Sequence, residues 1–192
     1  MPELDLSTEL ETAVEAARQA ARIQMELYEN LESVDFKSEK DVVTIADHRS
    51  EEAILEIIGK AFPGDAFLAE ESGESGEMAD RLWVIDPLDG TVNYANGIPF
   101  FAVSIGLCVD GEPKLGVVLD PTRDELFTAV RGGGAFLNGS PVRNPGRKLS
   151  DAVVALGLPS SGFGRQYREI RRRVRITRAM GSATLSLTYC AN

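Results

Sequence analysis

Cysteine and histidine are scarce in this chain: its 192 residues include two cysteines and one histidine. Cys108 and Cys190 lie near no other cysteine or histidine at metal-ligand spacing, which argues against a disulfide framework and a zinc site. We therefore predict two buried, reduced thiols. The single histidine, His48, is predicted to lie on the surface without a role.

Long apolar runs are also missing. No stretch approaches the roughly 20 apolar residues that cross a bilayer. The first residues, MPELDLSTELETAVEAARQ, lack the basic start and apolar stretch of a secretory signal. With 43% hydrophobic and 26% charged residues, the composition is that of an ordinary globular chain. We therefore expect a cytoplasmic protein that does not contact a membrane.

Positive charge is in deficit, since 20 basic residues face 30 acidic ones, for a net charge of −10. This charge disfavours a general grip on nucleic acid, so no nucleic-acid partner is expected, and it would attract divalent cations. One basic segment stands out, REIRRRVRITR from Arg168 to Arg178. Without interleaved aromatic residues, it is predicted to be a solvated face or a strand edge, with an anion or partner site as the alternative.

Apolar periodicity predicts two amphipathic helices ahead of a sheet. Thr8 and Glu11 form a capping-box pattern, and a helix is predicted over about 9–29. Apolar residues recur there at helical spacing (Leu10, Val14, Ala17, Ala21 and Met25). A polar, partly extended link, KSEKDVVTIAD, is expected next. Ile54, Leu55 and Ile58 then indicate a second helix that ends at FPGD.

Short β-rich runs follow the helices. AFLAEES and LWVID end in carboxylates, as buried strands with polar ends do, and the acidic SGESGEMAD between them is predicted to be a loop. FAVSIGLCVDGEPKLGVVLD predicts a hairpin that turns at 110–113. ELFTAV predicts another strand, and RGGGAFLNGSPV a glycine-rich turn into a short one. Successive hairpins imply a largely antiparallel sheet, so we predict an α+β fold with two helices on one sheet face.

A second unit is predicted to open at DAVVALGLPS. We expect an N-terminal α+β domain over 1–148 that carries the site, and an incomplete α/β domain over 149–192, because about 45 residues bury little apolar surface. Within it we expect a strand, a helix near 166–173, a strand near 174–177, and a helix with small residues in SATLSLTYCA.

Two aspartates stand three residues apart in LWVIDPLDGTVNY. Asp86 is predicted to leave its strand, Pro87 fixes φ and removes a donor, and Asp89 follows closely enough for both carboxylates to face one point. Gly90 allows a tight turn. A helical turn from Thr91 would aim the N–H groups of Gly90 and Thr91 at an anion such as phosphate.

Hard oxygen ligands gather around this turn. The carbonyl of Leu88 is expected to be free, Glu70 and Glu71 end a neighbouring strand, and Asp47 stands ahead of the second helix. Such oxygens favour Mg²⁺ or Mn²⁺ over zinc. Two structural interpretations stay open: D-P-x-D-G is ordinary turn chemistry, and Asp47 suits the first turn of a helix.

Taken in order, six motifs resemble the inositol monophosphatase family along nearly the whole chain: DVVTIAD, AEES, WVIDPLDGTVNY, PFFAVSIGL, GGGAFLNGSPV and GSATLSL. The resemblance implies a layered αβαβα sandwich and a homodimer. It also implies lithium-sensitive hydrolysis of a small phosphate ester such as inositol monophosphate. The cofactor would be Mg²⁺, as two or three ions, with Mn²⁺ as a substitute.

The resemblance also implies metal ligands at matching positions. Glu70, Asp86 and the Leu88 carbonyl would bind one metal, and Asp86 and Asp89 would share a second. Family members continue past GSATLSL to a W-D-x-A motif whose aspartate completes the second metal site. This sequence reaches Asn192 without that motif, so we expect either a fragment or an incomplete site.

Substrate and catalytic roles follow from the same resemblance. Asp89 and the backbone amides of Gly90 and Thr91 would bind the substrate. Thr91, hydrogen-bonded to Asp47, and Glu70 would position and activate the attacking water. Two metals about 4 Å apart can stabilise both the entering and the leaving oxygen of such an in-line displacement.

Several alternatives stay open at this point. A non-catalytic metal-binding or interaction module is one, and family members that act on fructose 1,6-bisphosphate, histidinol phosphate or phosphoadenosine phosphate are another. A haloacid-dehalogenase-like loop is disfavoured, because Asp89 follows Asp86 by three positions and not two. An EF-hand is excluded, because the twelfth position from Asp86 is Gly97.

Overall fold

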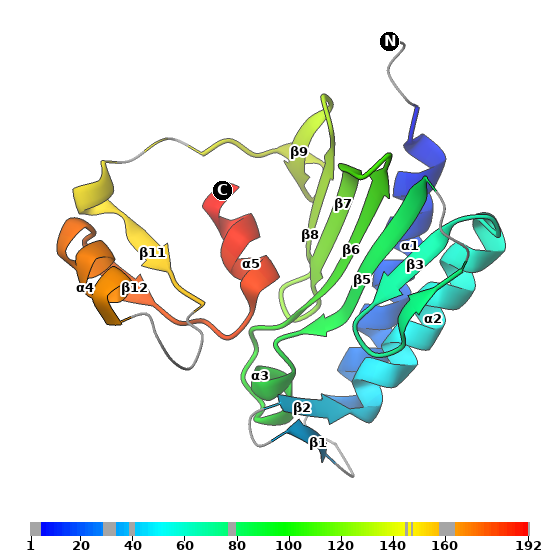
Figure 1. Cartoon of the computed structure of the whole chain (residues 1–192), viewed down its shortest axis with the longest axis horizontal. Coiled ribbons are helices and arrows are strands. Elements are labelled where there is room, and N and C mark those ends of the chain that lie inside the picture. Colours follow the sequence, from blue (N-terminus) through cyan, green and yellow to red (C-terminus); the bar gives the residue numbers. More distant parts are fainter. Residues whose placement is uncertain are drawn as a thin grey trace.

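The computed structural model describes residues 5–28, 34–38, 41–76, 80–144, 146, 148–157 and 164–191. Its main sheet has eight strands: β3 (Ala66–Ala69), β4 (Gly73–Ser75), β5 (Arg81–Asp89), β6 (Ala102–Val109), β7 (Glu112–Asp120), β8 (Glu125–Val130), β9 (Gly134–Leu137) and β10 (Ser140–Pro141). Their order is β10-β9-β8-β7-β6-β5-β3-β4. The helices α1 (Ser7–Leu27) and α2 (Ile45–Ala61) cover one face of this sheet, and α5 (Ala183–Thr188) lies on the other (Figure 1). The predicted α+β fold is confirmed.

The sheet is largely antiparallel, as predicted, with one parallel pair between β3 and β5. The predicted hairpin is formed by β6 and β7, which are joined at Asp110 and Gly111. Both residues have positive φ, 54° and 74°, as the two central residues of a type I′ turn require. Part of the predicted loop is instead β4, whose Gly73 pairs with Ala69. Because β4 lies at the edge of the sheet, its side chains stay in water and its sequence lacks the apolar alternation by which a strand is predicted.

Both predicted helices are present, with different first residues. The α1 helix begins at Ser7, and Leu6 at its N-cap makes no side-chain cap, so the predicted capping box of Thr8 and Glu11 is wrong. The α2 helix begins at Ile45, where Thr44 caps it: the Thr44 Oγ1 accepts from the N–H of Ala46 at 3.2 Å. The predicted end of the first helix at residue 29 lies outside the described residues.

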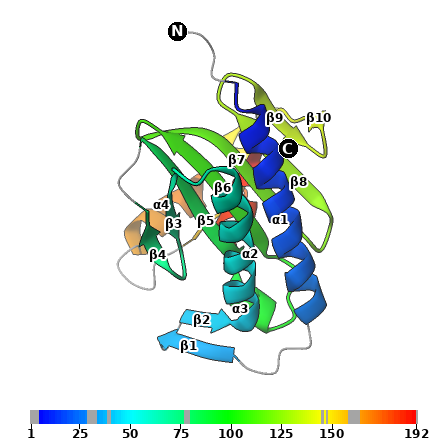
Figure 2. The ribbon, with the colours of Figure 1, turned by 90° about the vertical axis from the view of Figure 1, so that its right-hand side faces the viewer.

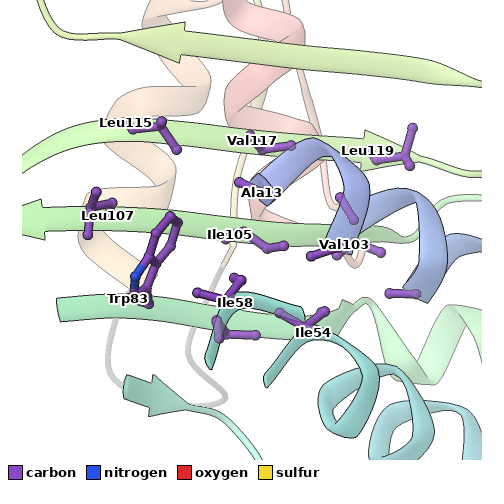
Figure 3. Close-up of a cluster of buried hydrophobic side chains, with 14 of the residues drawn as sticks. Ala13, Ile54, Ile58, Trp83, Val103, Ile105, Leu107, Leu115, Val117 and Leu119 are labelled. Atoms are coloured by element: carbon purple, nitrogen blue, oxygen red, sulfur yellow. The ribbon is translucent and has the colours of Figure 1, made fainter. Parts of the chain in front are cut away.

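Figure 2 shows α1 and α2 lying next to each other across the sheet. The face of α1 toward the sheet carries alanines with no exposed surface (Ala13, Ala16, Ala17 and Ala20). Small side chains let the helix axis approach the strands closely. In contrast, α2 sends Ile54 and Ile58 toward the fully buried Trp83 and Ile105 (Figure 3). This packing fixes the helix layer against β5, which ends with the D-P-L-D of the D-P-L-D-G-T motif.

A two-stranded antiparallel sheet, β1 (Val34–Ser38) with β2 (Asp41–Thr44), forms the partly extended link ahead of α2. Beyond residue 148, η1 (Leu149–Asp151), β11 (Val153–Ala155), α4 (Gly164–Arg173) and β12 (Ile176–Arg178) precede α5, and η2 (Tyr189–Ala191) follows it. The strands β11 and β12 pair in parallel. The predicted helices and strands of this segment are present within a few residues, and the domain boundary near 148 stays a prediction.

The two cysteines, the single histidine and the basic segment all have some exposed surface. Cys108 and Cys190 are both free, but Cys190 is exposed and Cys108 is half-buried, so their predicted full burial is wrong. His48 is exposed, as predicted. The arginines of α4 and β12 are exposed, as a solvated face requires, and the alternative of an anion or partner site there stays a prediction. No helix in the described parts of the chain combines the length and apolar character needed to span a membrane.

Candidate metal and phosphate site

The strand β5 continues through Asp86 to Asp89, so the prediction that Asp86 leaves the strand is wrong. The bend comes instead from a bulge. Asp86 pairs with Ser104 and Asp89 with Ala102, so three steps of β5 face two of β6. The N–H of Leu88 donates to Asp86 Oδ1 at 3.1 Å and closes the bulge. A bulge re-aims side chains at a strand end, and here it turns both aspartates into one region.

Gly90 makes the turn that follows. Its φ is 98°, in the left-handed region. A Cβ on this residue would stand 3.1 Å from the carbonyl oxygen of Phe100 and 3.3 Å from that of Gly181, both tighter than ordinary contact. The helix α3 (Thr91–Ala95) starts directly afterwards, as predicted. Glycine is therefore required on two counts, conformation and space.

Thr91 and Asp47 meet at the starts of α3 and α2. The Thr91 hydroxyl lies 2.9 Å from Asp47 Oδ1 and 3.0 Å from the carbonyl oxygen of Leu88, so two acceptors share its one proton. The expectation of a free Leu88 carbonyl is therefore wrong, although a carbonyl oxygen keeps a second lone pair. Asp47 Oδ2 accepts from the N–H and the hydroxyl of Thr44 at 2.8 and 2.6 Å. The capping and functional interpretations of Asp47 are thus compatible.

Charge concentrates at this end of the sheet. Burial is the main cause that raises the pKa of Asp86, to about 8, and the charge of Glu70, the charge of Asp89 and a side-chain contact with Glu70 add to the effect. Asp47 is 1% exposed, and burial raises its pKa while the bonds from Thr44 and Thr91 oppose the rise. Carboxylates that raise one another's pKa lack a counter-charge, which a divalent cation would supply. The donor set fits a hard cation.

Asp89 is held by the segment that starts α5. Its Oδ2 accepts from the Ser182 hydroxyl at 2.5 Å, and from the N–H and hydroxyl of Thr184 at 2.7 and 2.5 Å. Within the described residues, no group of three or more His, Cys, Asp or Glu side chains lies in metal-holding geometry. The engagement of Asp89 Oδ2 by these donors is consistent with that finding.

Ser182 and Thr184 were not predicted as site residues. The only sequence signal was their place in GSATLSL, because neither is acidic and both lie far from Asp89 in the chain. Asn93 adds a second link between the same two segments, since its Nδ2 donates to the carbonyls of Phe100 and Met180 at 2.7 and 2.9 Å. The segment before α5 is therefore docked directly on the D-P-L-D-G-T turn.

The α+β fold, with D-P-L-D at the bulged end of β5 and G-T at the start of α3, is of the inositol monophosphatase type. The chain belongs to the inositol monophosphatase family, whose model matches residues 5–192. Among solved structures, it is similar to the extragenic suppressor protein suhB of Bartonella henselae, with a TM-score of 0.89 and 40% identity, over 95% of this chain and 74% of the other. It is also similar to the IMPase of Thermotoga maritima, with a TM-score of 0.87 and 34% identity, over 95% and 72%.

Curated relatives carry two different names. An inositol-1-monophosphatase of Mesorhizobium japonicum is 41% identical over 194 residues, which cover 97% of this chain and 72% of the relative. A Nus factor SuhB of Pseudomonas aeruginosa is 42% identical over 196 residues, which cover 95% and 72%. Family membership therefore fixes the fold, whereas the activity has to be argued from the site.

Proposed function

We propose that the protein is a Mg²⁺-dependent phosphomonoesterase that hydrolyses inositol monophosphate, or a related sugar or alcohol phosphate, to the alcohol and inorganic phosphate. One observation carries the proposal: the charges of Glu70 and Asp89 act on the Asp86 carboxyl group, and Thr91, five residues further along the chain, is hydrogen-bonded to the buried Asp47. The proposed metal ligands Asp86 and Asp89 and the proposed water-activating Thr91 would then lie within six consecutive residues.

The metal ligands in this proposal are oxygens only. Glu70, Asp86 and the second lone pair of the Leu88 carbonyl would hold one Mg²⁺, and Asp86 and Asp89 a second, with Mn²⁺ as a substitute. Bound ions supply Lewis acidity at the phosphoryl oxygens and neutralise the clustered carboxylates. Glu70 is exposed, so a ligand reaches it without unfolding of the turn.

The proton chemistry falls to Thr91, Asp47 and Glu70. Asp47 accepts the Thr91 hydroxyl proton in a hydrogen bond, which leaves the threonine oxygen able to accept a proton from a water. Glu70 would orient the same water and take up its second hydrogen bond. The amides of Gly90 and Thr91, together with Asp89, would hold the substrate. Water is the nucleophile, and no covalent intermediate forms.

The test measures phosphate release by the 192-residue chain from a panel of phosphate esters, with Mg²⁺ and with or without Li⁺. The panel includes inositol monophosphate, fructose 1,6-bisphosphate, histidinol phosphate and phosphoadenosine phosphate, so it also ranks the substrates. Asp86→Asn should abolish the Mg²⁺-dependent release. Asp110→Asn, in the exposed hairpin turn where asparagine tolerates a φ of 54°, is the matched control. Unchanged turnover in Asp86→Asn would overturn the proposal.

A second candidate is a non-catalytic role, as a metal-binding or interaction module. It is supported by the relatives named Nus factor SuhB and by the exposed arginines of α4, which offer an acidic partner a positive surface on an otherwise acidic chain. Mn²⁺ binding without phosphate release from any ester of the panel would favour this role. Our first proposal includes a cytoplasmic homodimer that acts on a small phosphate ester, without a nucleic-acid or membrane partner.

A further inference from the structure

A buried amide on α1 contacts the D-P-L-D-G-T turn. Gln24 has no exposed surface, and its Nε2 donates to the carbonyl oxygen of Pro87 at 2.7 Å. The main-chain carbonyl of Gln24 accepts from the hydroxyl of Tyr94, also at 2.7 Å, which ties α1 to α3 as well. Among the described residues, Oε1 of Gln24 has no hydrogen-bond partner. The Pro87 carbonyl lies between the two predicted ligands Asp86 and Leu88.

A buried carboxylate on α2 makes the corresponding contact on the other ligand segment. Glu51 is 4% exposed, and its two oxygens accept from the N–H groups of Glu71 and Ser72 at 2.8 and 2.9 Å. These are the two residues directly after Glu70. The N–H of Glu70 itself donates to the carbonyl of Ile85 at 3.1 Å. The main chain around Glu70 is therefore held from β5 on one side and from α2 on the other.

Neither side chain is explained by packing. Ile54 and Ile58 show that α2 buries apolar side chains against β5. Burying an amide or a carboxylate there costs free energy unless hydrogen bonds compensate it. In both cases, the compensating bonds go to main-chain groups next to predicted metal ligands. Such bonds limit the rotation of the peptides that aim the ligand side chains.

We propose that Gln24 and Glu51 are positioning residues of the metal site: Gln24 fixes the Asp86–Leu88 peptides and Glu51 fixes Glu70. This inference rests on the proposed function, because it concerns the ligands of that site. Partners of metal ligands typically change affinity 10–100-fold when they are mutated. Neither residue touches the reacting groups, so neither is a catalytic residue.

The test measures Mn²⁺ affinity of the 192-residue chain by titration calorimetry. Glu51→Gln keeps the shape but sets an amide donor against one of the two N–H groups, and Gln24→Met keeps the length but removes the donor. We expect each to weaken Mn²⁺ binding about tenfold. The matched controls are Glu52→Gln on the exposed side of α2 and Gln19→Met on the partly exposed side of α1, and both should bind Mn²⁺ like the wild type.

A double-mutant cycle separates positioning from a general loss of structure. In a Glu70→Gln background, Glu51→Gln should have no further effect on Mn²⁺ affinity, because the ligand through which it acts is gone. Gln24→Met should still weaken binding there, since it acts through Asp86 and Leu88. Equal effects of Glu51→Gln in both backgrounds, or wild-type affinity in both positioning variants, would overturn the inference.

Amide hydrogen exchange at Glu71 and Ser72 provides a readout that needs no metal. It should accelerate in Glu51→Gln and stay unchanged in Glu52→Gln. If the wild type binds no Mn²⁺ and releases no phosphate, the proposed function fails, whereas unchanged exchange at these two amides in Glu51→Gln contradicts the present inference alone.

Discussion

Thr91 and Asp47 stand 44 residues apart in the sequence, yet the hydroxyl of one donates to the carboxylate of the other at 2.9 Å. Their elements explain the contact. Asp47 lies in the first turn of α2, where Thr44 binds its second oxygen, and Thr91 opens α3 directly after the Gly90 turn. Two helix starts therefore meet over one hydrogen bond, and the predicted metal turn lies beside it.

Removing the Thr91 hydroxyl should reduce turnover without removing the metal. Thr91→Val keeps the shape and deletes the donor to Asp47, so we expect kcat to fall on the order of 10²-fold, as for loss of a proton-transfer group. Thr91→Ser keeps the hydroxyl and should retain most of the activity. Phosphate-release kinetics with parallel Mn²⁺ titrations check this, and equal kcat in the valine and serine variants would contradict it.

The raised pKa of Asp86 predicts how the metal-free protein responds to pH. Its pKa rises from 3.8 to about 8 on folding, so between these values the folded state binds more protons than the unfolded state. The free energy of unfolding of the metal-free protein is therefore not reduced by Asp86 at low pH, and it falls as the pH rises from about 4 toward 8. Asp86→Asn lacks this loss, so in EDTA its Tm should gain on the wild type from pH 4 to pH 8.

Magnesium should reverse the advantage in Tm that Asp86→Asn has over the wild type in EDTA at pH 8. With excess Mg²⁺ at pH 8, the wild type should gain Tm and Asp86→Asn should gain little, because a ligand that binds only the folded state stabilises it. Thermal melts at several pH values, with EDTA or Mg²⁺, check both statements. If the difference in Tm between the wild type and Asp86→Asn in EDTA stays constant from pH 4 to pH 8, Asp86 is not the titrating group.

Gly181 should tolerate no side chain. Its φ is 82°, and a Cβ there would lie 2.7 Å from the amide atoms of Asn93, which holds Phe100 and Met180. Gly97 has a φ of 67° with nothing within 4 Å, so Gly97→Ala costs about 1–2 kcal/mol from the backbone conformation alone. We expect Gly181→Ala to lose at least about 1 kcal/mol more, since Asn93 must move and lose a bond. Urea unfolding of both variants measures the difference, and equal losses would refute the clash.

Ser182 should stabilise the start of α5 and Asp89 together. Its Oγ accepts from the N–H of Leu185 at 3.2 Å and donates to Asp89 Oδ2. Ser182→Ala removes an N-cap, for which a loss of about 1 kcal/mol in the free energy of unfolding is typical. The exposed Ser75 of β4 provides the control variant Ser75→Ala, which should change the stability little. A loss no larger than that of the control would show that Thr184 alone holds Asp89.

Local chemistry explains what the sequence predicted well. The β6–β7 hairpin depends on Asp110 and Gly111, two neighbours that accept positive φ, so its position was visible in the sequence. The D-P-L-D-G-T turn was likewise visible, because Pro87 and Gly90 each determine the backbone conformation at their own position. The bulge was not, since it arises from the register of β5 against β6, which no single residue encodes.

Long-range bonds to the main chain explain what was missed. Gln24 contacts a carbonyl 63 residues away, and any residue type would present that carbonyl. Glu51 accepts from two main-chain N–H groups, which almost any residue type would also present. Asp89 was predicted as a metal ligand, but its partners Ser182 and Thr184 come from a motif with no acidic residue. Side-chain identity therefore pointed to the proposed ligands and not to the groups that hold them.

The bonds from Ser182 and Thr184 to Asp89 also have a consequence for the order of events during synthesis. These donors follow the aspartate by 93 and 95 residues, so most of the main sheet leaves the ribosome before they do. Until then, the nascent chain carries an acidic turn whose anchoring partners have not yet been translated. A growing polypeptide of this kind would reach its final arrangement at Asp89 only after Ser182 and Thr184 have left the ribosome.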